Sequence, residues 1–119
     1  MKEVMAIIRQ ENINKTKNDL VKEGFPSLTA RKVLGRGRMS VEFDLAENSG
    51  IKAEGLSRGS RLMPKRIITI IVKDEEVDKV VGAIIRSNSK GNKGDGKIFV
   101  LPVTEVYRVR DNKRDNETL

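Results

Sequence analysis

The stretch that decides the fold is RIITIIV at residues 66–72, in which isoleucine, threonine and valine fill almost every position. That density of β-branched side chains predicts a central strand of a β-sheet. Three further stretches predict strands: KEVMAIIR at 2–9, LTARKVL at 28–34 and IFVLPV at 98–103. Pro102 in the last of these indicates an edge strand or a strand end, because proline lacks the N–H that a central strand needs.

Two segments between these strands have apolar residues at helical spacing instead. The first predicts a helix over residues 13–23, which Asn12 or Asn14 can cap and which Gly24 ends. Its apolar face contains Ile13, Thr16, Leu20 and Val21. We expect the second helix to be capped by Asp74. Its apolar stripe contains Val77, Val80, Val81, Ile84 and Ile85.

The resulting order, β-α-β-β-α-β, predicts an α+β fold of the ferredoxin-like type. In this arrangement both helices cover one face of an antiparallel sheet. The strands at residues 2–9 and 66–72 are apolar on both sides, so the other face of the sheet also needs a cover. We therefore expect the chain to form an oligomer through its open sheet face.

The chain has 119 residues, 37% of them hydrophobic and 34% charged, which predicts one compact domain. We place this domain at residues 1–110, with a long loop at 37–63 and a solvated, mobile tail at 111–119. No apolar run approaches the roughly 20 residues of a membrane span, and the first residues do not resemble a secretory signal. The expected location is cytoplasmic, with no insertion into a membrane.

The chain contains neither cysteine nor histidine. It therefore lacks a thiol nucleophile, the usual ligands of a zinc finger and the side chain that most often acts as a general base near neutral pH. We predict no catalytic residues, no metal-binding residues and no enzymatic activity. The composition argues against the alternative of an acyl or phosphoryl transferase on the same fold.

The net charge of +7 indicates an anionic partner, either a phosphate-bearing ligand or a nucleic acid. Aromatic residues make up only 3% of the chain, and RIITIIV at 66–72 contains none. A ferredoxin-like sheet that binds RNA needs exposed aromatic side chains on its central strands. A nucleic-acid-binding protein is therefore a distant alternative, and we expect no DNA or RNA partner.

Three segments combine glycine or extended backbone with cationic side chains. They are GNKGDGK at 91–97, GRGR at 35–38, and TEVYRVR at 104–110, in which Arg108 and Arg110 should point to the same face of an extended segment. Each has an ordinary alternative: a flexible loop, a bend with solvated arginines, and a charged edge strand. Together they predict one binding site for a nucleotide polyphosphate, because no single segment can neutralise a triphosphate.

Several of these motifs resemble the nitrogen-regulatory PII signal-transduction proteins. They are GDGKIFVLPV at 94–103, VYRVR at 106–110, VLGRGR at 33–38 and the opening MKEVMAII. The resemblance covers roughly residues 1–110 apart from the loop. It implies a homotrimer, or a mixed oligomer with a paralogous subunit, that binds ATP or ADP in clefts between neighbouring subunits. It also identifies residues 37–63 as the T-loop, which contacts a target protein.

The resemblance also implies which residues form the nucleotide site. Gly35, Gly37 and Arg38 would approach the phosphates from one subunit, and Gly94, Asp95, Gly96 and Lys97 would do so from the base of the next loop. Arg108 and Arg110 would close the site across the interface. Others would lie near the rest of the nucleotide, namely Ile7, Thr29, Ile71 and Phe99. Lys65 matches the lysine that pairs with 2-oxoglutarate in many members. Met39 stands where a glutamine commonly helps to hold Mg²⁺ and 2-oxoglutarate, and a thioether is a poor ligand for Mg²⁺. We therefore expect 2-oxoglutarate binding to be weak or to depend on a partner subunit.

The loop predicts a surface that binds a protein. Its apolar residues and arginines alternate with acids, and the candidate contact residues are Val41, Phe43, Leu45, Ile51, Leu56, Arg58 and Arg61. It contains no tyrosine, so it cannot be uridylylated. The chain is similar to the subgroup encoded in nitrogen-fixation clusters of methanogens, which implies that the target is nitrogenase. The alternatives are an ammonium transporter, a nitrogen-assimilation enzyme, or an insertion without any partner.

Overall fold

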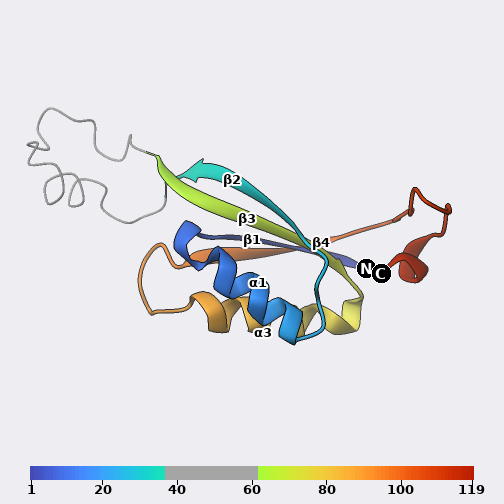
Figure 1. The fold of residues 1–119 in the computed structure, drawn as a ribbon, viewed down its shortest axis with the longest axis horizontal. Helices are drawn as coiled ribbons and strands as arrows, with labels where there is room; N and C mark the ends of the chain where they lie inside the picture. The colour runs from blue at the N-terminus through green and yellow to red at the C-terminus, as the bar shows by residue number, and fades with distance from the viewer. Residues whose placement is uncertain (37–61) are drawn as a thin grey trace, which may run out of the picture.

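The structure is a computed structural model that describes residues 1–36 and 62–119. It contains an antiparallel sheet with strand order β2-β3-β1-β4, and helices α1 and α3 lie together on one face of it (Figure 1). The strands are β1 (Lys2–Arg9), β2 (Thr29–Gly35), β3 (Met63–Val72) and β4 (Gly96–Pro102), and the helices are α1 (Ile13–Lys22) and α3 (Val77–Asn88). This confirms the predicted ferredoxin-like α+β fold.

Two strands are longer at one end than the sequence pattern predicted. β3 starts at Met63 and includes Pro64, so the last residue of the predicted loop belongs to the strand. β1 ends at Arg9 opposite Lys65, so Pro64 has only β2 beside it and its missing N–H breaks no bond to β1. β4 starts at Gly96, while Pro102 ends it on an edge of the sheet, as predicted.

The core lies between the sheet and the two helices. Alternate residues of β1, among them Val4, Ala6 and Ile8, are buried against the helices. The other core residues are Leu20, Phe25, Ile68, Ile70, Val72, Val80, Ala83 and Ile84. A buried hydrogen bond from Asn88 Nδ2 to Thr16 Oγ1, 3.0 Å long, joins α3 to α1 within this layer. Most of the predicted helix faces therefore pack as the amphipathic spacing placed them, but the assignment of Val21 and Ile85 to these faces was wrong, since they are 54% and 50% exposed.

The two helices begin differently from our prediction. Asn12 precedes α1, but its side chain makes no capping hydrogen bond; its carbonyl instead accepts a hydrogen bond of 2.7 Å from Thr16 Oγ1. The prediction that Asp74 caps the second helix was wrong. A short 3-10 turn (Asp74–Glu76) comes before α3, and Glu76 Oε1 accepts a hydrogen bond from Lys73 N–H at 3.0 Å. Asp74 instead pairs with the N-terminal amine of Met1 at 2.8 Å.

The second face of the sheet carries apolar side chains that neither α1 nor α3 covers. The strand register brings Ile7 beside Ile67 and Met5 beside Thr69 on this face, and Figure 1 shows both helices on the opposite side. Phe99 lies beside Met5 and is 43% exposed. The described part of a single chain therefore leaves this face open, as the sequence predicted.

The C-terminal residues are mostly exposed, as expected of a solvated tail, but they form hydrogen-bonded structure that the sequence analysis did not predict. The N–H of Asp115 donates to the carbonyl of Val106 at 2.7 Å, and the N–H of Arg108 donates to the carbonyl of Lys113 at 2.8 Å. Residues 106–115 thus form a hairpin, and a short 3-10 helix (Asp115–Thr118) follows it. No helix among residues 1–36 and 62–119 has the length and apolar character needed to cross a bilayer. The domain boundary at residue 110 stays a prediction.

Two adjacent isoleucines of α3 test this description of the core. Ile84 is 1% exposed and Ile85 is 50% exposed. Ile84→Ala should lower the free energy of unfolding by about 2–5 kcal/mol, because it leaves a cavity among well-packed side chains. Ile85→Ala should cost less than half as much. Denaturant unfolding of both variants measures this, and equal losses would mean that the register of α3 is wrong.

Candidate functional site

A cationic hollow of about 610 Å³ lies at the end of the sheet where β1 and β2 end and β3 and β4 begin. Its volume is in the range of small-molecule sites. The residues that line it are Ile7, Arg36, Lys65, Lys93, Gly94, Gly96 and Lys97. Five of these, Ile7, Lys65, Gly94, Gly96 and Lys97, are predicted site residues, so the structure brings part of the predicted site together.

The loop before β4, residues 90–95, is organised by the carboxylate of Asp95. Asp95 Oδ2 accepts hydrogen bonds from the N–H groups of Lys90 at 2.7 Å and Asn92 at 3.1 Å. These bonds, the one from Lys90 above all, hold the pKa of Asp95 below its ordinary value, and the nearby Arg9 guanidinium also contributes. The side chain of Asp95 therefore shapes the loop, and its direct approach to a phosphate stays a prediction.

Gly96 is required by the contact between β4 and β1. Its φ is +137°, a backbone conformation that other residues rarely adopt. A Cβ at this position would overlap the carbonyl oxygen of Ile7. Gly96 therefore lets the loop join the sheet edge directly beside the hollow.

Two cations hold the carbonyl groups of the same loop. Arg9 Nη2 donates to the carbonyl of Lys93 at 2.9 Å and lies 3.7 Å from Asp95 Oδ1. Lys65 Nζ donates to the carbonyl of Gly94 at 3.3 Å. Burial lowers the pKa of Lys65, and the charge of Arg9 lowers it further. An anion in the hollow would relieve this excess of positive charge.

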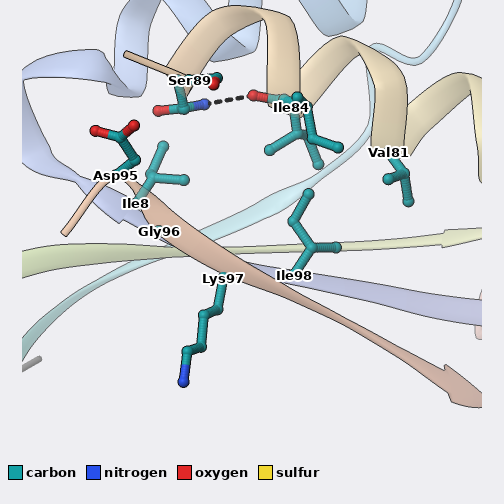
Figure 2. A pocket seen from close by; sticks show the side chains of 10 residues that line it. Ile8, Val81, Ile84, Ser89, Asp95, Gly96, Lys97 and Ile98 are labelled. Atoms are coloured by element: carbon teal, nitrogen blue, oxygen red, sulfur yellow. Dashed lines mark hydrogen bonds between the residues drawn. The ribbon is translucent and has the colours of Figure 1, made fainter. Parts of the chain in front are cut away.

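The two faces of β4 have different chemistry. Figure 2 shows Ile98 pointing toward α3 and Lys97 pointing away from it, on the opposite side of the strand. The α3 side forms an apolar groove of about 430 Å³ with Ile8, Val81 and Ile84 in its wall. The cationic hollow is therefore separated from this groove by the strand itself.

Three further predicted residues lie at the opposite end of the sheet. Thr29, Ile71 and Arg108 line a second hollow of about 690 Å³ between the turn after α1 and the C-terminal hairpin. Lys65 and Ile71 are separated by roughly 20 Å along β3, since a strand rises about 3.3 Å per residue. Figure 1 shows the C-terminal segment beyond the end of the sheet that is remote from the start of β4. One chain therefore does not bring the two groups into contact.

The two predicted arginines are not arranged as expected. We predicted an extended segment with Arg108 and Arg110 pointing to the same face, but this segment turns back as a hairpin. Asp111 binds Arg108 through two hydrogen bonds, from Nε at 2.9 Å and from Nη2 at 2.6 Å. The side chain of Arg110 is 76% exposed and lies 4.0 Å from Asp111 Oδ2. The carboxylate of Asp111 is therefore an anion that the hairpin itself supplies to both arginines.

The remaining predicted residues divide into two sets. Gly35 ends β2 opposite Met63, at the edge of the cationic hollow, and Phe99 lies on the open sheet face. The others fall outside the described residues, namely Gly37, Arg38, Met39, Val41, Phe43, Leu45, Ile51, Leu56, Arg58 and Arg61. Our sequence analysis included Arg36 and Lys93 within the cationic segments GRGR and GNKGDGK, and it did not assign Arg9 or Asp111 to the site. The one sequence signal for Asp111 is that it directly follows the two arginines of RVR at 108–110, which puts a carboxylate close to them in the chain.

Comparison with known proteins gives consistent results. Residues 1–113 match the family described as Nitrogen regulatory protein P-II. The chain is 43% identical over 121 residues to "Nitrogen fixation nifHD region GlnB-like protein 2" of Methanothermobacter marburgensis, with 100% of both chains covered. It is 40% identical over 119 residues to the protein of the same name in Methanococcus maripaludis, with 96% of both chains covered. Among solved structures, Arabidopsis thaliana PII bound to citrate matches with a TM-score of 0.75 and 30% identity, over 98% of this chain and 86% of that one.

The role of Asp95 can be tested through pH. Because its pKa is lowered in the folded state, its stabilising effect is present above the ordinary value of 3.8 and is lost as the pH falls through the lowered value. The wild type should therefore be more stable than Asp95→Asn at neutral pH, and the difference should shrink in acid. Urea unfolding across this pH range measures the difference. A difference that stays constant into strong acid would contradict the role of this carboxylate.

Proposed function

This chain belongs to the P-II family of nitrogen regulatory proteins, and on that premise we propose that it binds ATP or ADP and uses the bound state to control a protein of nitrogen fixation. The family relationship supports a regulatory role rather than an enzymatic one. The observation that best supports nucleotide binding is the cationic hollow beside the glycine-rich loop. A polyphosphate supplies the negative charge that Arg36, Lys65, Lys93 and Lys97 lack in the described part of the chain.

The residues of the hollow fit a phosphate chain. Gly94 lines the hollow and has a φ of +88°, so the backbone there can approach a ligand without a side chain in the way. Arg9 and Lys65 donate to the carbonyls of Lys93 and Gly94, so the negative ends of these two carbonyls are already matched by cations. The described lining contains no carboxylate, so Mg²⁺ at this place would depend on phosphate oxygens and water for its ligands.

We propose that each nucleotide site is shared by two subunits. Lys97 lies at one end of the sheet and Arg108 at the other, so a single chain cannot place both on one triphosphate. An oligomer that covers the open sheet face would also bury Met5, Ile7 and Ile67. The trimer that is typical of this family satisfies both requirements. The proposal has two forms, one with identical subunits and one with paralogous subunits.

The proposed target is nitrogenase, contacted by the loop at residues 37–63. The names of the relatives place them in a nitrogen fixation nifHD region, and their similarity extends over the full chain. The loop sequence combines Val41, Phe43 and Leu45 with flanking charges, a composition suited to binding a protein surface. No described residue favours an ammonium transporter or another enzyme of nitrogen assimilation over nitrogenase. Binding of 2-oxoglutarate through Lys65 stays a prediction.

Complementation between two variants tests the shared site. Lys97→Ala and Arg108→Ala should each weaken ATP binding by about 2–4 kcal/mol, the range for loss of a charged partner. A Lys97→Ala subunit still supplies Arg108, and an Arg108→Ala subunit still supplies Lys97. A co-expressed mixture should therefore regain tight binding at a fraction of its sites, measured by calorimetry. A mixture as weak as its parents would contradict a site built across subunits.

Deletion of residues 42–60 tests the role of the loop. This deletion should abolish binding to nitrogenase, or its inhibition, because the candidate contact residues are removed. The affinity for ATP should stay nearly constant, since the described hollow is formed by residues outside the deletion. Pull-down, activity and calorimetric measurements on the same preparation give both results. Inhibition that survives the deletion would place the docking surface elsewhere.

A further inference from the structure

The guanidinium of Arg108 is already bound by a carboxylate in the described structure. Its Nε donates to Asp111 Oδ1 at 2.9 Å and its Nη2 donates to Asp111 Oδ2 at 2.6 Å. This is the parallel two-bond geometry with which arginine also binds phosphate oxygens. A phosphate that used the same edge of Arg108 would have to displace Asp111.

The hairpin fixes Asp111 in this position. The N–H of Asn112 donates to the carbonyl of Arg108 at 2.8 Å, and Asn112 has a φ of +58°, so the chain turns tightly around Asp111. The N–H of Lys113 donates to Asp111 Oδ1 at 3.2 Å, which holds the carboxylate from the other side. The side chains of Arg108 and Asp111 are 31% and 32% exposed, so a ligand can still reach the pair.

We propose that Asp111 determines nucleotide affinity by competing with a phosphate group for Arg108. This inference rests on the proposed function, since it assumes that Arg108 contacts the nucleotide. Asp111 and a phosphate are both anionic acceptors, so they cannot share one edge of the guanidinium, and each also repels the other. Removing the charge of Asp111 therefore strengthens nucleotide binding. If Asp111 merely oriented Arg108 toward the ligand, its removal would weaken binding, so the sign of the effect separates the two roles.

The hairpin offers a matched control in Asp115. Asp115 Oδ1 accepts a hydrogen bond from the N–H of Val106 at 3.3 Å, in the same hairpin as Asp111. The carboxylate that pairs with Arg108 is that of Asp111. Asp115→Asn therefore removes the same charge from the same segment without freeing the arginine.

The experiment is calorimetric titration of ATP into the wild type, Asp111→Asn, Asp115→Asn and Arg108→Ala. Asp111→Asn should bind ATP about two- to five-fold more tightly, as expected for the loss of one partly exposed ion pair. Asp115→Asn should stay close to the wild type. Equal or weaker binding by Asp111→Asn, with a wild type that binds ATP, would overturn this inference alone. Failure of both the wild type and Asp111→Asn to bind ATP would overturn the proposed function.

A double variant completes the test. In the Arg108→Ala background, the further change Asp111→Asn should no longer strengthen ATP binding, because the contested guanidinium is absent. The same gain in both backgrounds would show general charge repulsion and would overturn competition at Arg108. Thermal unfolding of each variant checks that the hairpin change leaves the fold intact. A loss of stability that accompanies weaker binding by Asp111→Asn would count against the proposal, because it would give Asp111 a structural role.

Discussion

The structure depends on one constraint: the two central strands, β1 and β3, are apolar on both faces, but the described residues supply helices for only one face. Packing α1 and α3 on one side buries Val4, Ala6 and Ile8 completely. The alternate residues of the same strands, such as Ile7 and Ile67, then remain on the other side. The single chain is therefore an incomplete unit, and the need to cover this face is the physical basis for the proposed oligomer.

The same constraint explains why the candidate site is divided. In the antiparallel sheet, the end of β2, the start of β3 and the loop before β4 lie at one end. The C-terminal hairpin extends past the other end. Cations collect at both ends: among the described residues the lysines and Arg36 of the hollow have no paired carboxylate, whereas Arg108 at the other end is paired with Asp111. Neighbouring subunits that meet over the open face can bring opposite ends together. In this arrangement, the oligomer would serve both the core and the ligand site.

The cationic side chains of the hollow and of the hairpin have different hydrogen-bond acceptors. In the hollow, Lys65 binds a carbonyl oxygen of the loop, which is a neutral acceptor, so its positive charge remains, while Arg9 beside the hollow also lies 3.7 Å from Asp95. In the hairpin, Asp111 neutralises Arg108 through a bidentate pair. Together the two arrangements predict that a nucleotide gains most of its attraction from the hollow and exchanges one anion for another at the hairpin.

The sequence alone determined the order and type of the elements, because β-branched runs and helical spacing are local signals. It also identified the family motifs and the glycine-rich loop. Only the tertiary structure decided the charge partners. Asp74 bound the N-terminal amine instead of capping a helix, since folding brought Met1 beside it. Arg108 pairs with Asp111 because residues 106–115 form a hydrogen-bonded hairpin, where the sequence predicted an extended segment followed by a mobile tail. The role of Arg9 depended on a contact with Lys93, which is distant in the chain, and no local pattern in the sequence encodes such a pairing.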